Sequence, residues 1–203
     1  MKVDHALEDL SDEPATSNHQ LNGSSNSSFA DIKDFAESNG AIEDVCFYIT
    51  PIGEDDSEQR KHADLFLGSL IEPALESLKL KVIRADKIAK PGTITKQIIE
   101  YIFRAKLVIA DLSYHNPNVF YELALRHAAR LPTVQIIRKS DKIPFDLSHY
   151  RTITIDTTDI YTLVPKLETY KSEISTQVEE VLKDPDIVDN PVINVFPNLK
   201  LKI

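Results

Sequence analysis

The strongest constraint on the fold is the stretch 106–130, which reads KLVIAD, then LSYHNPN, then VFYELALRHAAR. Leu107 to Ala110 form a continuous apolar run, the pattern of a parallel strand that is covered by helices on both faces. The polar segment after it contains Asn-Pro-Asn and predicts a turn. The last segment has the apolar spacing of an amphipathic helix. The stretch therefore predicts one strand–turn–helix unit of a parallel α/β fold.

Strands and helices alternate in the same way throughout 44–182. Short apolar runs predict four more strands, over 45–49, 80–85, 133–138 and 152–156. The helix expected before 80 carries Pro73, which should kink or interrupt it. We expect an α/β fold with a five-stranded parallel sheet, a flavodoxin-like three-layer sandwich of strand order 2-1-3-4-5.

Three regions follow from composition. We expect 1–43 to be a mostly disordered acidic segment, because 1–28 are poor in apolar residues and end in NGSSNSS. Within it, 29–38 has the spacing of a short helix that either packs on the core or binds a partner. The α/β domain should span 44–183. The proline-containing stretch 184–203 is expected to be an extended tail that adds an edge strand or binds a partner chain.

Charge and cysteine content narrow the partners and the compartment. Residues 1–40 hold eight acidic residues and two lysines of a chain with net charge −9, whereas 41–183 are nearly neutral. Without a basic patch, no nucleic-acid partner is expected. The single cysteine, Cys46, excludes a disulfide framework and is expected to be buried and inert. The absence of a signal peptide and of a long apolar run predicts a cytoplasmic protein with no membrane partner.

The residues best placed for chemistry follow the predicted strand ends. Asp111 ends the third strand, and the helix after the turn carries Asn118 and Glu122 four residues apart, on one face. In a sheet of order 2-1-3-4-5, this cluster faces the end of the first strand across one crevice. The remaining candidates at these strand ends are Tyr48, Thr50, Pro51, Ile52, Gly53, Asp86, Ser113, Asn116 and Arg138.

Simpler explanations exist for several of these residues. Glu122 has an i+4 neighbour, Arg126, with which it could form an ordinary helix ion pair. Residues 60–62, Arg-Lys-His, are either solvated charges or contacts for a phosphate at a helix N-terminus. The motifs GxGxxG, GxxxxGK[ST], HExxH and GxSxG are missing, so no dinucleotide fingerprint, P-loop, zinc site or serine-hydrolase elbow is indicated. We expect neither a cofactor nor a metal.

Three segments together resemble the nucleoside 2-deoxyribosyltransferase-like family: FYITPIG, RADKI…PGTITKQII and VIADLSYHNPNVFYELALRHA. The resemblance covers about 44–156, and the last segment is its most specific part. It implies a flavodoxin-like fold, structurally akin to the TIR domain. It also implies chemistry at an N-glycosidic bond, with a nucleotide or nucleoside as the small-molecule partner. Because this family often completes its active sites across subunits, the resemblance leaves open whether the protein is a monomer or a homo-oligomer.

The resemblance assigns roles to the candidate residues. Glu122 takes the place of the glutamate that attacks the anomeric carbon, as in a retaining glycosidase. Asn116 and Asn118 would orient that carboxylate or contact the sugar hydroxyls, and Asp111 would contact the sugar or the base. The segment from Tyr48 to Gly53 would line the ribose and phosphate side, and Arg138 would reach a phosphate.

The sequence departs from the family at one position. Near the start of the helix before the third strand, the transferases carry an acidic residue that acts on the nucleobase. Thr95 and Gln97 stand where the transferases carry it, so base protonation by that route is in doubt. Nicotinamide leaves NAD as a neutral base without a general acid, which makes NAD a reasonable substrate beside deoxynucleosides and deoxynucleotides. We therefore expect an N-glycosidase acting on a nucleotide. The alternatives are a catalytically silent nucleotide-binding module and a deoxyribosyltransferase of nucleoside salvage.

Overall fold

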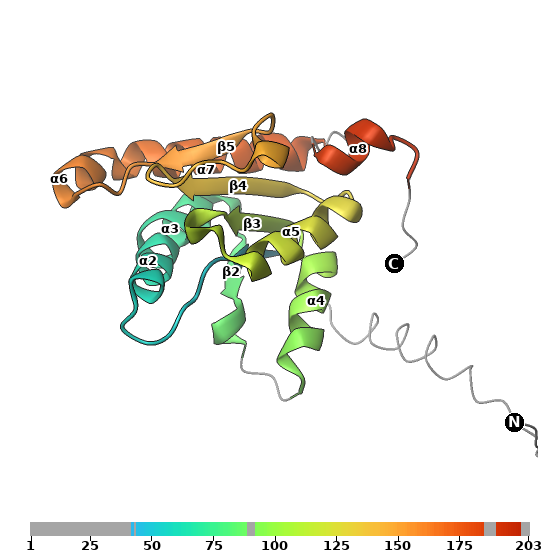
Figure 1. Cartoon of the computed structure of the whole chain (residues 1–203), viewed down its shortest axis with the longest axis horizontal. Helices are drawn as coiled ribbons and strands as arrows, with labels where there is room; N and C mark the ends of the chain where they lie inside the picture. Colours follow the sequence, from blue (N-terminus) through green and yellow to red (C-terminus); the bar gives the residue numbers. More distant parts are fainter. Residues whose placement is uncertain (1–41, 43, 89–91, 185–189, 200–203) are drawn as a thin grey trace, which may run out of the picture. The chain divides into compact units, whose positions relative to one another are not determined.

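The computed structural model describes residues 42, 44–88, 92–184 and 190–199, and its core is one parallel sheet (Figure 1). The sheet has the order β2-β1-β3-β4-β5, so the predicted fold class and strand order are confirmed. The strands are β1 Val45–Ile49, β2 Lys81–Arg84, β3 Leu107–Asp111, β4 Thr133–Arg138 and β5 Thr152–Ile155. Every residue of β1 and β3 is buried, as expected for central strands. Apart from Ile42, the predictions for 1–43 lie outside the described residues.

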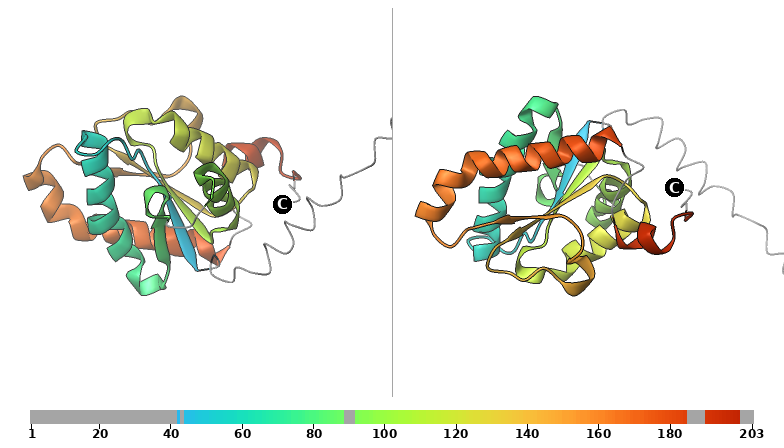
Figure 2. Two further views of the ribbon diagram at one scale, coloured as in Figure 1. Left: turned by 90° about the horizontal axis from the view of Figure 1, so that it is seen from below. Right: turned by 90° about the horizontal axis from the view of Figure 1, so that it is seen from above.

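Helices cover both faces of the sheet (Figures 1 and 2). One face packs against α2 Glu58–Phe66, α3 Glu72–Leu75 and α7 Leu167–Lys183, and the other against α4 Ile94–Arg104 and α5 Pro117–Ala128. Because side chains alternate along a strand, Cys46 and Tyr48 enter the first core, and Phe47 and Ile49 enter the second. Two shorter helices are α6 Ile160–Leu163 and α8 Pro191–Val195. Within the described ranges, no helix combines the length and the apolar character needed to cross a membrane.

Pro73 interrupts its helix as predicted. Ordinary α-helical geometry ends at Phe66 and is followed by a π-helical turn, Leu67–Ile71. Helix α3 then begins at Glu72, with Pro73 in its first turn. The Glu72 amide donates to the Leu67 carbonyl, five residues back, and Pro73 has no amide hydrogen to donate, so the helix changes its hydrogen-bond pattern just before the proline. Short 3-10 turns complete the chain at Glu76–Leu78, Ala85–Lys87, Ser113–His115, Phe145–Leu147 and Val164–Lys166.

The prediction of an extended tail over 184–203 is wrong for residues 190–199. Asn190 is buried and its side-chain oxygen accepts hydrogen bonds from the first amides of α8, while Pro191 occupies the first turn. Asn before Pro is a strong helix-start signal, and it outweighs the helix-breaking role of the prolines. Helix α8 packs on α5, and the side-chain amide of Asn190 donates to the carbonyl of His127 on α5.

Arg126 joins α4 and α5 in the core. Its guanidinium is fully buried and donates to the carbonyls of Ile102 and Ala105 at 2.6 and 2.9 Å, and to that of Pro132 at 3.0 Å. The carbonyls at the end of a helix lack partners within the helix. Arg126 therefore supplies donors to the C-terminal end of α4 from the neighbouring helix and also binds the chain just before β4.

We predict that Arg126→Met lowers the free energy of unfolding by at least about 3 kcal/mol, because buried carbonyls lose their donors. The matched control is Arg130→Met. Arg130 also donates to two carbonyls, those of Pro197 and Leu199, but at the surface. That variant should cost less than about 1 kcal/mol. Urea unfolding measures both, and equal losses would contradict the role given to Arg126.

Candidate functional site

A cavity of about 200 Å³ lies at the carboxyl ends of β1 and β2, against the start of α5. In an open α/β sheet this is where ligands bind, beside the position at which the strand order reverses. Most of the residues predicted for the site lie here. The cavity is lined by Tyr48, Ile49, Thr50, Ile52, Gly53, Ala85, Ile98, Asn116, Asn118, Val119 and Glu122.

Glu122 is the one carboxylate of that lining, and it lies on the second turn of α5. The ion pair with Arg126 that offered a simpler explanation is not formed, because the Arg126 guanidinium is turned to the backbone carbonyls. Among the described residues, the Glu122 carboxylate has no hydrogen-bond partner and no ion pair. Burial alone raises the pKa of Glu122 to about 7. A carboxylate of this kind is a frequent mark of a functional site.

The start of α5 explains how Asn118 and Glu122 come together. Asn116 is the N-cap, and its side-chain oxygen accepts from the Asn118 amide at 3.0 Å. Pro117 occupies the first helical position, as is common. One helical turn then separates Asn118 from Glu122, so both reach the same cavity. Asn116 thus holds the helix start as well as lining the cavity.

Asp111 lies behind the cavity wall, not in it. It is fully buried and accepts hydrogen bonds from the hydroxyls of Tyr48 and Thr50, both at 3.1 Å. His62 Nε2 lies 2.7 Å from the same oxygen, and the amide of Ser113 donates to the other oxygen at 3.0 Å. Burial opposes ionisation, but the hydrogen bonds from His62 and Ser113 hold the pKa of Asp111 below its ordinary value. Asp111 thus positions two residues of the cavity wall.

His62 is the residue of this region whose place the sequence did not indicate. It is buried, its ring packs on Phe66 at 3.9 Å between centroids, and it meets Tyr114 edge-on. The phosphate-contact alternative is wrong for His62, and Arg60 is bound to Asp86 at 2.7 Å. One available signal was its spacing: His62 lies four residues before Phe66 and shares the apolar face of α2.

Gly53 is required by the local backbone. Its φ is +64°, and an added Cβ would lie 2.5 Å from the Ser57 hydroxyl and 2.8 Å from the Gln59 Cβ. Ser57 is the N-cap of α2 and accepts from the Arg60 amide. The resemblance placed Gly53 on the ribose and phosphate side of the site. The nearer reason is the tight start of α2, although Gly53 also lines the cavity.

Other predicted residues lie outside the cavity lining. Asp86 binds Arg84 at 2.6 Å and also binds Arg60. The Arg138 guanidinium is paired with Asp141 and lies 3.5 Å above the Tyr114 ring. Two further predicted residues, Pro51 and Ser113, are buried, and Ser113 accepts from the Arg138 amide.

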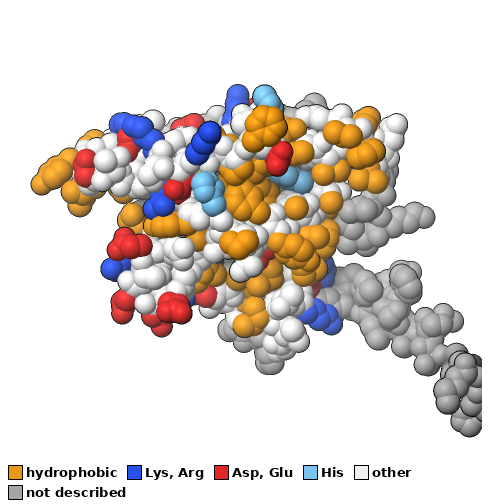
Figure 3. Space-filling model, viewed as in Figure 1, with side chains coloured by type: hydrophobic (Ala, Val, Ile, Leu, Met, Phe, Trp, Pro, Cys, Tyr) orange, Lys and Arg blue, Asp and Glu red, His pale blue; other side chains and the backbone are white. Residues whose placement is uncertain are grey.

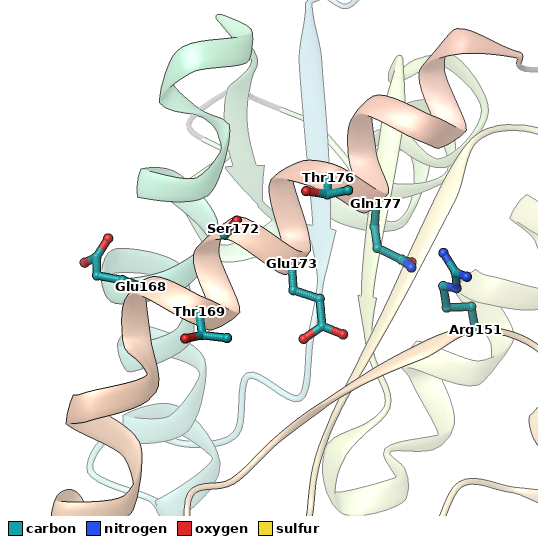
Figure 4. A pocket seen from close by; sticks show the side chains of 7 residues that line it. All are labelled: Arg151, Glu168, Thr169, Ser172, Glu173, Thr176 and Gln177. Atoms are coloured by element: carbon teal, nitrogen blue, oxygen red, sulfur yellow. The ribbon is translucent and has the colours of Figure 1, made fainter.

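Another hollow, of about 860 Å³, lies on the outer side of α7 (Figure 4). Its side chains are mainly polar, and Arg151 faces Gln177 there. We favour the smaller cavity as the site because it contains a partly buried carboxylate without a partner, whereas the α7 hollow is an open surface.

The cavity offers a limited set of chemical groups. Besides Glu122, the one titratable side chain among its described lining residues is Tyr48. Burial and Asp111 raise the pKa of Tyr48 well above the ordinary value, so the phenol stays protonated. Among the described residues, no group of acids, histidines or cysteines has the arrangement of a metal site. Glu122 can therefore serve as a nucleophile or, when protonated, as a hydrogen-bond donor. Comparison of the chain with protein-family models and with curated proteins found no match.

We predict that Glu122→Gln stabilises the protein at high pH. Between the ordinary pKa of 4.5 and the folded value of about 7, the unfolded carboxyl loses its proton while the folded one keeps it. The wild type therefore loses stability as pH rises through this window, by about 2–3 kcal/mol, and the amide variant does not. Urea unfolding from pH 4 to pH 8 should show a growing gap. The difference in unfolding free energy between the wild type and the exposed Glu72→Gln variant should not change with pH. A difference that is also independent of pH for Glu122→Gln would contradict the raised pKa of Glu122.

Proposed function

We propose that the protein is an N-glycosidase that cleaves the N-glycosidic bond of a nucleotide with Glu122 as the nucleophile. The observation that carries the proposal is the Glu122 carboxylate, which has no partner in the described part of the chain and lies in a cavity at the switch point of the sheet. The resemblance of the VIADLSYHNPNVFYELALRHA segment to the nucleoside 2-deoxyribosyltransferase-like family supports the same role for this residue.

In this mechanism the ionised Glu122 attacks the anomeric carbon of the sugar. The bond from that carbon to the base breaks, and its electron pair leaves with the base. A carboxylate stabilises the oxocarbenium-like transition state and then forms a glycosyl-enzyme. Asn118 and Thr50 line the cavity where the sugar hydroxyls would lie. Water, or a second base, attacks the same carbon and releases Glu122.

The leaving group favours NAD as the substrate. Among the described residues, the cavity lining has no acid besides Glu122, and the Tyr48 hydroxyl donates to Asp111. A base that must be protonated on departure would have no donor here, whereas nicotinamide leaves as a neutral molecule from a cation. The positive charge of bound NAD would also lower the pKa of Glu122 and favour its ionised form. A deoxynucleotide is the second choice, and a salvage transferase the third.

A catalytically silent nucleotide-binding module is the alternative. A cavity of about 200 Å³ lies below the roughly 300–1,000 Å³ of typical ligand sites. A carboxyl with a pKa of about 7 can also remain protonated and donate a hydrogen bond to a ligand. Such a module would bind a nucleotide equally well with Gln at position 122 and would release no base.

We predict that the wild type releases free base from NAD and that Glu122→Gln lowers the rate by at least about 10³-fold while retaining nucleotide binding. Chromatography of incubations with NAD, deoxynucleosides and deoxynucleotides measures the release. The Glu72→Gln variant, on α3, is the matched control and should keep full activity. Binding without release by the wild type would favour the silent module.

The pH dependence tests the role of Glu122 separately. If Glu122 acts as the nucleophile, kcat/KM should rise with pH through about 7, because the Glu122 carboxyl of the free enzyme must be ionised to react. The pH midpoint for kcat should lie lower, since the nicotinamide ring of bound NAD places a positive charge beside the carboxylate. Steady-state rates from pH 5 to pH 9 measure both. A kcat/KM that falls through pH 7 would instead indicate a general acid.

A further inference from the structure

A second hollow, of about 630 Å³, lies between the 3-10 turn after β3 and the loop after β4. It is lined by His115, Lys142, Ile143, Pro144, Phe145 and Ser148. The mechanism above uses none of these side chains. The hollow combines an aromatic ring, aliphatic surface and a cation, which is the composition of sites that bind a nucleobase and its phosphate.

Phe145 is the most distinctive residue of this hollow. Its side chain is 83% exposed, whereas Leu147, two residues later, is 7% exposed and enters the core. The turn that carries the ring is fixed: the Leu147 amide donates to the Pro144 carbonyl at 3.0 Å, and the Ser148 hydroxyl donates to the Phe145 carbonyl at 2.7 Å. The ring is thus presented to solvent on an ordered backbone. Apolar side chains also gather on the face of the molecule shown in Figure 3.

Lys142 supplies the charge. Its carbonyl lies 2.7 Å from His115 Nε2, which ties the loop to the turn after β3. Its ammonium group forms no ion pair among the described residues, so it remains available to an anion. The neighbouring carboxylate of Asp141 is already bound to Arg138 and to the Tyr114 amide. No acidic side chain lines the hollow within the described part of the chain.

The linings of the hollow and of the Glu122 cavity meet along the chain, at the border between positions 115 and 116. His115 lines the hollow, and the next residue, Asn116, lines the cavity. Tyr114 and His115 both have positive φ, 58° and 49°, so the chain turns sharply at this border. For residues other than glycine this is a strained conformation, of the kind that clusters at ligand sites. A dinucleotide bound to both spaces would pass Asn116.

We propose that the substrate is a dinucleotide, and that this hollow binds its second nucleotide, with the base stacked on Phe145 and the phosphate near Lys142. The proposal rests on the proposed function, because it places the reacting sugar beside Glu122. A mononucleotide substrate would leave the hollow empty.

The test compares NAD with nicotinamide mononucleotide, which carries the same reacting bond but lacks the second nucleotide. In the wild type, kcat/KM for NAD should exceed that for the mononucleotide, and Phe145→Ala should lower this ratio about tenfold, as expected for the loss of one base–aromatic stack. Lys142→Ala should lower it in the same direction. Tyr161→Ala removes another strongly exposed aromatic side chain, on α6, and should leave the ratio unchanged. An unchanged ratio in Phe145→Ala, with NAD still cleaved, would overturn the second subsite and leave the proposed function intact.

Calorimetry with adenosine monophosphate separates the two proposals. The wild type and Glu122→Gln should bind it equally, and Phe145→Ala should bind it about tenfold more weakly. If no nucleotide is cleaved but this pattern of binding is found, the proposed function fails and the nucleotide-binding hollow stands. If adenosine monophosphate does not bind, or binds Phe145→Ala as it binds the wild type, the hollow is not a nucleotide site.

Discussion

The buried carboxylate of Asp111 determines the arrangement at the carboxyl edge of the sheet. A charge without solvent must be matched by hydrogen-bond donors, since an unmatched one would cost several kcal/mol. Here the donors come from the end of β1, from α2 and from the turn after β3. Satisfying this one group therefore fixes Tyr48 and Thr50, which form one wall of the candidate cavity. The hydrogen bonds that satisfy Asp111 therefore also hold a wall of the proposed site in place.

The fold, and the position of the candidate cavity at the strand ends, follow from local patterns in the sequence. The continuous apolar run that ends at Asp111 has the pattern of a doubly covered strand, and β4 begins and ends where its run does, at Thr133–Arg138. Once the strand order is known, topology alone brings the segment 50–53 to the start of α5. The spacing of Asn118 and Glu122 likewise predicts one shared face. These are short-range rules applied to an ordinary α/β arrangement.

Which groups pair in the interior could not be predicted in this way. Arg126 has Glu122 within reach along the helix but binds the carbonyls at the end of α4, because those carbonyls are buried and lack donors. His62 lies among charged residues in the sequence and binds Asp111, forty-nine positions away. Such choices depend on distances between elements, which a single sequence does not contain.

The hydrogen bonds between Arg126 and the end of α4 also hold one side of the cavity more firmly than the other. Ile98 of α4 and Glu122 of α5 belong to one side, and the shared guanidinium prevents these helices from sliding independently. The opposite side is the loop at Ile52 and Gly53, which continues into exposed residues before α2. A widening of the cavity on the side of that loop would leave the Glu122 carboxylate in register with the sheet, because Glu122 lies on α5.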